Sequence, residues 1–214
     1  ILIRKHPEFI ETMIATSLTG CVFVPIDPRI KGRKLAYTIN NSNCKGVICA
    51  DYSAAAVVGI RDQVPGLEWI WLMETGESGA DTTVADVPGS EAMASILDCP
   101  EVSFDSRLQD PMHPVQIIYT SGTTGDPKGV MIANMRLGGG TMGGRALRFQ
   151  AGDRPYTGLS LTHGNAQSLT FFPAIGMDLP VVLSRKFTKS RLWDITRQYG
   201  CTVFNLLGGM TTAI

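Results

Sequence analysis

The chain alternates short, apolar, β-branched runs with longer segments in which apolar residues recur every three or four positions. The short runs predict strands at residues 21–24, 46–50, 67–72, 115–119, 129–132, 156–161, 180–184 and 201–207. The longer segments predict helices over residues 32–41, 53–63, 134–148, 165–175 and 190–199, and a first helix opened by His6-Pro7-Glu8 and capped by Gly20. Strands separated by helices need crossover connections, so we expect an α/β fold with largely parallel sheets flanked by helices.

Two stretches depart from this alternation. Residues 74 to about 114 are rich in Gly, Ser, Asp and Pro, which predicts a surface connection with a short helix at Ser90–Leu97. The helix expected from an N-cap at Asn134 to about Arg148 contains Gly138, Gly139, Gly140, Gly143 and Gly144. Each glycine costs about 0.5–1 kcal/mol relative to alanine. This segment therefore packs unusually close to a neighbour, or part of it is not helical.

The twelve residues from Tyr119 to Val130 combine small hydroxyls, glycines and a lysine between two apolar strands. Glycines let successive backbone N–H groups converge on one anion, and hydroxyls and a lysine add donors suited to phosphate. The loop is not a Walker A motif, because Asp126-Pro127 separates Gly125 from Lys128. The composition predicts a polyphosphate cradle, with a hairpin turn rich in Gly, Asp and Pro as the alternative.

The whole string Tyr-Thr-Ser-Gly-Thr-Thr-Gly-Asp-Pro-Lys-Gly-Val resembles the phosphate-binding signature of the adenylate-forming superfamily. This superfamily includes acyl- and aryl-CoA ligases, adenylation domains of peptide synthetases, and luciferases. The segment from Gly20 to Pro28 is similar to the family's Gly-Ala-x-Tyr-Val-Pro-Ile-Asn/Asp-Pro segment. The resemblance implies that the chain is part of the large N-terminal domain of an adenylate-forming enzyme.

The resemblance also implies an activity, in which ATP and a carboxylic acid form an acyl-adenylate and the acyl group then passes to a thiol, usually coenzyme A. Lys128, at the motif's lysine position, is implied to steady the loop or the phosphates, and an ordinary solvated lysine is the alternative. The ATP-binding residues implied by the motif are Thr120, Ser121, Gly122, Thr123, Thr124, Gly125 and Lys128.

The segment Leu159–His163 is similar to the family's Leu-Pro-Leu-Phe-His segment. This implies that His163 is a second catalytic residue, beside the acyl carboxylate, although a capping or core-edge histidine is the alternative. Gly164 and Asn165 follow as substrate-binding residues. The polar Asn165 and Gln167 favour a short or polar acid unless they cap the next helix, and this wider segment is similar to that of carnitine/crotonobetaine-CoA ligases.

Three positions depart from the family pattern: Asn134, Thr162 and Gly208. The family's adenine-binding segment, its ribose-binding Asp, its Mg²⁺-binding Glu and its C-terminal lysine are expected beyond Ile214. We therefore expect residues 1–214 to be an incomplete N-terminal domain that is inactive alone. Its first α/β part with the connector would span residues 1–110, and the part containing the phosphate loop would span residues 111–214.

Composition narrows the class of protein further. With 19 basic and 19 acidic side chains, the chain has no net charge and no basic stripe, which argues against a nucleic-acid partner. We see neither a membrane-spanning apolar run nor a signal peptide. The five cysteines lack metal-ligand spacing and predict reduced core thiols in a cytoplasmic protein.

The sequence is consistent with three functions: an acyl-CoA ligase, an adenylation domain that loads a carrier protein, and a non-catalytic nucleotide-binding relative. The expected small-molecule partners are a carboxylic acid, ATP and coenzyme A, and a homodimer is left open.

Overall fold

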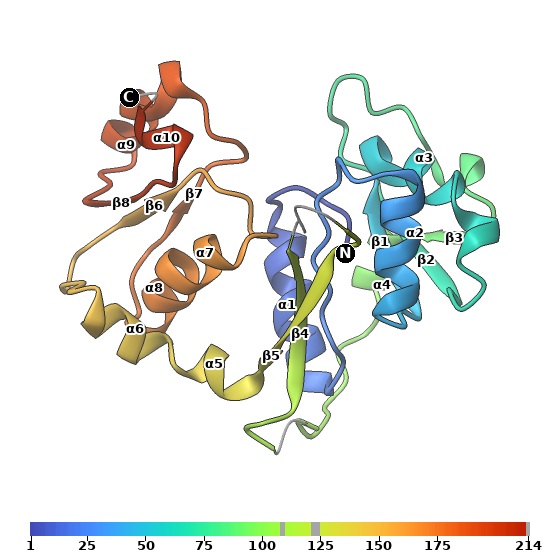
Figure 1. Ribbon diagram of the computed structural model, residues 1–214, viewed down its shortest axis with the longest axis horizontal. Coiled ribbons are helices and arrows are strands. Elements are labelled where there is room, and N and C mark those ends of the chain that lie inside the picture. Colours follow the sequence, from blue (N-terminus) through green and yellow to red (C-terminus); the bar gives the residue numbers. More distant parts are fainter. Residues whose placement is uncertain (108–109, 121–124, 213–214) are drawn as a thin grey trace. The chain divides into compact units, whose positions relative to one another are not determined.

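The computed structural model describes residues 1–107, 110–120 and 125–212, and its helices and strands are labelled in Figure 1. The chain divides into two compact units. The first unit comprises Ile1–Arg4, Glu8–Gln109 and Val115–Met131, and the second comprises Lys5–Pro7, Asp110–Pro114 and Ile132–Ile214.

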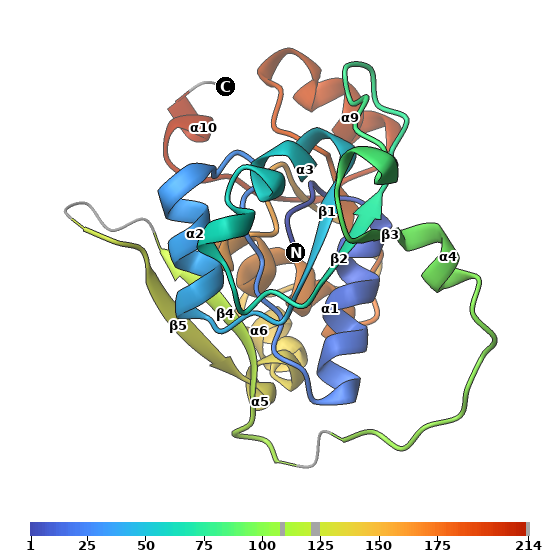
Figure 2. The same cartoon turned by 90° about the vertical axis from the view of Figure 1, so that its right-hand side faces the viewer.

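The first unit contains a parallel three-stranded sheet of order β1-β2-β3 and a separate two-stranded sheet formed by β4 and β5 (Figure 2). Its helices and strands are α1 (Pro7–Thr19), α2 (Gly32–Asn41), β1 (Gly46–Ala50), α3 (Asp51–Val58), η1 (Arg61–Gln63), β2 (Trp69–Met73), η2 (Val84–Asp86), β3 (Ser90–Ala92), α4 (Met93–Leu97), β4 (Pro114–Thr120) and β5 (Lys128–Ala133).

The register of the first sheet explains its core. Val47 and Cys49 of β1 pair with Ile70 and Leu72 of β2, so these four side chains share one face of the sheet. Helices α2 and α3 add apolar residues to the same buried cluster, among them Leu35. Apolar burial on this scale is the main favourable term in folding.

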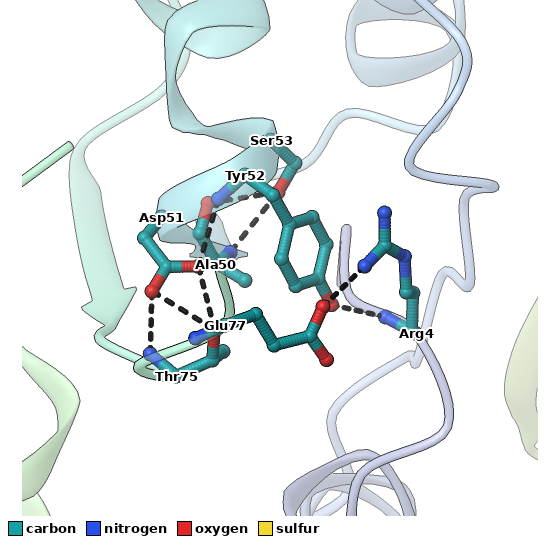
Figure 3. Close-up of polar contacts among 7 residues, drawn as sticks. All are labelled: Arg4, Ala50, Asp51, Tyr52, Ser53, Thr75 and Glu77. Carbon is teal, nitrogen blue, oxygen red and sulfur yellow. Dashed lines mark hydrogen bonds and ion pairs between the residues drawn. The ribbon is translucent and has the colours of Figure 1, made fainter. Parts of the chain in front are cut away.

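A polar cluster lies where β1, α3 and the loop after β2 meet (Figure 3). The buried carboxylate of Asp51 accepts hydrogen bonds from the backbone N–H of Thr75 at 2.6 Å and from its hydroxyl at 2.9 Å. Arg4 pairs with Glu77, and its guanidinium lies 4.1 Å from the centre of the Tyr52 ring. Burial, the largest influence, raises the pKa of Tyr52 to about 12. The drawn groups bond to one another, which indicates a structural role.

The second unit is built around a parallel sheet of order β7-β6-β8. The side chain of Tyr156, on the central strand, is fully buried, and its hydroxyl lies 2.9 Å from that of Ser184. The helices and strands of this unit are α5 (Asn134–Gly138), α6 (Gly140–Ala146), β6 (Pro155–Thr157), α7 (Gly164–Ala166), the π-helical turn η3 (Gln167–Phe171), α8 (Phe172–Gly176), β7 (Val182–Leu183), η4 (Lys189–Arg191), α9 (Leu192–Gln198), β8 (Val203–Asn205) and α10 (Gly209–Thr212). The predicted fold class, α/β with largely parallel sheets flanked by helices, is confirmed.

The glycine-rich segment satisfies both of its predicted explanations. The helix is interrupted at Gly139, where α5 ends and α6 begins. Beyond the break, α6 packs closely against α8: a Cβ added to Gly140 would lie 2.2 Å from the carbonyl oxygen of Phe172, and one added to Gly176 would lie 2.3 Å from the backbone nitrogen of Thr141. These two helices can approach so closely only because the contact positions lack side chains.

Some local predictions were wrong. Residues 21–24 do not form a strand, because only Phe23 pairs, with Gln116 of β4, before the Pro25 to Pro28 segment removes backbone donors. Asn134 is the first residue of α5 rather than its N-cap. Its N–H and that of Met135 instead reach the carbonyl oxygens of His113 and Pro111, at 2.9 and 2.8 Å, so no side-chain cap is needed.

The cysteine prediction holds in part. All five cysteines are free thiols, but Cys49 alone among them is buried, whereas Cys21 and Cys99 are exposed. Burial raises the pKa of Cys49 to about 12, which leaves its thiol protonated at neutral pH. Across the described part of the chain, the helices are too short or too polar to cross a membrane.

Candidate functional site

The expected phosphate loop lies between β4 and β5 of the first unit. Ser121, Gly122, Thr123 and Thr124, four of its predicted ATP-binding residues, lie outside the described residues. The base of the loop is described: the hydroxyl of Thr120, the last residue of β4, lies 3.4 Å from the carbonyl oxygen of Lys128, the first residue of β5. The end of β4 and the start of β5 are therefore in contact at the base of the loop.

Both ends of this loop are anchored to α2. The hydroxyl of Tyr119 donates to the side-chain oxygen of Asn41 at 2.6 Å, and Arg33 forms an ion pair with Asp126 at 3.0 Å. Thr120, Gly125 and Lys128 are all exposed. An exposed ammonium and a hydroxyl at the base of a glycine-containing loop are suited to a solvated anion such as a phosphate.

His163 lies in the second unit, at the residue that precedes α7. It follows a tight turn in which its N–H donates to the carbonyl oxygen of Ser160 at 3.0 Å, and the Ser160 and Thr162 hydroxyls lie 2.9 Å apart. The imidazole is exposed, whereas Leu161 and Thr162 on its N-terminal side are buried. The turn thus exposes the His163 side chain, while the two residues directly before it are buried.

Asn165 belongs to a small polar group shared by three elements. The amide nitrogen of Asn205, on β8, donates to the side-chain oxygen of Asn165 at 2.8 Å and to the hydroxyl of Thr170 at 2.9 Å. Gly164 and Asn165, the first two residues of α7, are both half-buried. The structure therefore brings His163, Gly164 and Asn165 together with two polar residues from elsewhere in the second unit.

Two further side chains support the turn before His163. The amide nitrogen of Gln167 donates to the carbonyl oxygen of Leu161 at 2.6 Å, and the Lys5 ammonium donates to the carbonyl oxygen of Leu159 at 2.7 Å. Both side chains are buried, and burial lowers the pKa of Lys5 to about 8. The Gln167 side chain therefore bonds back to the turn and does not cap the next helix, which was the structural alternative left open by the sequence.

Sequence reasoning did not identify Lys5, Thr170 or Asn205 as parts of this region. A polar residue inside the apolar run that ends at Leu207 was the available signal for Asn205. No pattern in the sequence distinguishes Lys5 from a surface lysine, because its burial depends on a segment more than 150 residues away.

Relatives of known name match most of the chain. The medium/long-chain-fatty-acid–CoA ligase FadD17 of Mycobacterium marinum is 28% identical over 213 residues, which cover 97% of this chain and 37% of the ligase. The human long-chain fatty acid transport protein 1 is 29% identical over 213 residues, covering 97% of this chain and 32% of that protein. The chain thus spans about a third of the length of these relatives.

The fold is also found in solved structures. The anthranilate CoA ligase AuaEII in complex with anthranoyl-AMP superposes with a TM-score of 0.82 at 17% identity, covering 95% of this chain and 38% of that one. The family model of the AMP-binding enzymes matches residues 1–214, the whole of the sequence. This chain is therefore a member of the AMP-binding enzyme family.

Proposed function

We propose that the protein to which this chain belongs is an AMP-forming acyl-CoA ligase. It would use ATP to activate a carboxylic acid as an acyl-adenylate and then transfer the acyl group to coenzyme A. The observation that carries this proposal is the phosphate-loop string, set between β4 and β5 in a chain that matches the AMP-binding family along its whole length. The names of the fatty-acid–CoA ligase relatives support the ligase assignment.

In this proposal the loop between β4 and β5 holds the polyphosphate of ATP. Thr120 to Gly125 would bind the β- and γ-phosphates, and Lys128 would supply a positive charge as negative charge builds up on the leaving pyrophosphate. The exposed position of Lys128 on a paired strand end supports this role. Mg²⁺ would neutralise phosphate charge in the same reaction, with its carboxylate ligand expected after Ile214.

The residues around His163 would contact the acid. His163 would orient the attacking carboxylate oxygen as a hydrogen-bond donor, and Gly164 and Asn165 would contact the acyl group. The Asn165–Asn205–Thr170 group supports a pocket wall that can hydrogen-bond a polar substituent on the acid. A short or polar acid, including one of the carnitine type, therefore stays a prediction beside the fatty acids that the relatives' names suggest.

The extent of the domain, its cellular location and its oligomeric state are also part of this proposal. We propose that residues 1–214 are an incomplete N-terminal domain, with parts at 1–110 and 111–214, and are inactive without the segments expected after Ile214. The cytoplasmic location and the homodimer likewise stay predictions, although five free thiols fit a reducing compartment.

The test is ATP–pyrophosphate exchange by the protein of the full reading frame, measured with fatty, aryl and polar carboxylic acids in turn. We expect exchange that depends on one class of acid, and thioester formation when coenzyme A is added. His163→Ala and Lys128→Ala should each lower kcat for exchange by about 100-fold, the usual scale for losing one transition-state donor. The exposed lysine substitutions Lys186→Ala and Lys189→Ala are the matched controls and should keep full activity.

The other functions predict different results. Exchange without transfer to coenzyme A would favour the loading of a carrier protein. A folded protein that binds ATP but shows no exchange with any acid would contradict the ligase proposal and favour the non-catalytic relative.

A further inference from the structure

The turn before His163 has its three consecutive carbonyl oxygens occupied. The carbonyl of Leu159 accepts from Lys5, that of Ser160 accepts from the N–H of His163, and that of Leu161 accepts from Gln167. Only the middle bond lies within the turn. The outer two come from side chains at other places in the chain, so the conformation of the turn depends on them.

Lys5 is a buried cation whose hydrogen-bond acceptor is a backbone carbonyl oxygen. The residue is 9% exposed, and its ammonium donates at 2.7 Å to a neutral carbonyl oxygen rather than to a carboxylate. Burying a cation is costly unless its hydrogen bonds offset the loss of water. A charge-assisted bond to Leu159 is a strong single contact of this kind, and it fixes the start of the turn.

Gln167 fixes the other end. Its side chain is 1% exposed and donates at 2.6 Å to the carbonyl oxygen of Leu161, two residues before His163. It is also the first residue of η3, a π-helical turn, and its own N–H bonds to the carbonyl oxygen of Gly164. Such turns are rare and occur frequently at functional sites. Gln167 thus joins the residues before His163 to those directly after it.

We propose that Lys5 and Gln167 are positioning residues that hold the turn Leu159–His163 and thereby set the orientation of the His163 imidazole. The catalytic part of this inference rests on the proposed function, whereas the structural part does not. Neither side chain needs to touch the substrate, because each acts through a backbone carbonyl of the turn that ends at the histidine.

The experiment uses the full-length protein with Lys5→Met and Gln167→Met, which keep approximate length but remove the donor. Amide hydrogen exchange of the peptide that contains Leu159–His163 should become about tenfold faster in each variant, the scale of one lost net hydrogen bond. The exposed pair Lys189→Met and Gln198→Met are matched controls and should leave this peptide unchanged. Because a variant at a buried site can fail to fold, Lys5→Gln, which retains an N–H donor, is measured as well and should keep the protection.

Kinetics then separate positioning from general destabilisation. We expect Lys5→Met to lower kcat for pyrophosphate exchange about tenfold with KM for ATP unchanged, but to change kcat less than about twofold in a His163→Ala background. Unchanged hydrogen exchange in both Met variants would overturn the proposal. So would an equal loss of kcat with and without His163. If the wild-type protein shows no pyrophosphate exchange, the proposed function fails, and hydrogen exchange alone decides whether the two contacts hold the turn.

Discussion

Gly138 and Gly140 lie in the same glycine-rich segment, but of these two only Gly140 lies in the close contact between α6 and α8. A Cβ on Gly140 would lie 2.2 Å from the carbonyl oxygen of Phe172 and 3.3 Å from the Cα of Gly176, so backbone would have to move. A Cβ on Gly138, two residues earlier at the end of α5, would meet nothing within 4 Å. We therefore expect the same substitution, glycine to alanine, to change stability in opposite directions at the two positions.

The magnitude follows from two opposing terms. Alanine in place of glycine in a helix gains about 0.5–1 kcal/mol from reduced chain entropy in the unfolded state. Overpacking a close contact costs about 1–3 kcal/mol, and the upper end applies at Gly140 because the contacted atoms are backbone. Gly140→Ala should thus lower the free energy of unfolding by about 2 kcal/mol, whereas Gly138→Ala should raise it by about 0.5 kcal/mol.

Urea unfolding in a Trp69→Phe/Trp71→Phe background measures this in the second unit, where Trp193 is then the remaining tryptophan. Trp193 packs against Phe204 of β8 with ring centres 5.8 Å apart, so its fluorescence should report unfolding of that unit. Equal shifts of the urea midpoint for Gly138→Ala and Gly140→Ala, or stabilisation by both, would refute the close packing of α6 on α8.

Two further predictions concern buried polar groups. Burial lowers the pKa of Lys5 from 10.5 to about 8. Between these pH values the unfolded chain therefore binds more protons than the folded chain. The free energy of unfolding should rise by about 3 kcal/mol as pH increases from 8 to 10.5. Lys5→Met should remove this rise in a pH series of urea titrations; an unchanged slope would show that Lys5 is solvated. Asp51→Ala should cost about 3 kcal/mol, because it removes a buried, hydrogen-bonded carboxylate and leaves the half-buried donors of Thr75 unpaired. The exposed Asp62→Ala is its control and should stay within about 0.5 kcal/mol by thermal unfolding.

Much of the fold was predictable because its signals are local. The apolar run at residues 46–50 and the helical spacing at residues 32–41 predict the bounds that the structure gives to β1 and α2. Likewise, Gly20 ends α1 with a φ of 76°, a left-handed conformation that glycine adopts without strain.

The failures came from contacts that are distant in sequence. The N-cap at Asn134 was wrong because carbonyls at residues 111 and 113, about twenty positions earlier, already satisfy the first N–H groups of α5. The site shows the same division: the string from Tyr119 to Val130 and the segment ending at His163 could be recognised from adjacent residues. The contact of Lys5 with the carbonyl oxygen of Leu159 could not, because it needs two distant segments to be brought together.

The origin of the oxygen in AMP tests the central claim most directly. The full-length protein would be given ATP, coenzyme A and a carboxylic acid labelled with oxygen-18 in its carboxylate. If the carboxylate attacks the α-phosphorus, the bridging oxygen of the acyl-adenylate comes from the acid and leaves with AMP when the thiol takes the acyl group. Our account predicts one labelled oxygen in the phosphate of AMP for each thioester formed. Label in inorganic phosphate, with ADP as the other product, would contradict it.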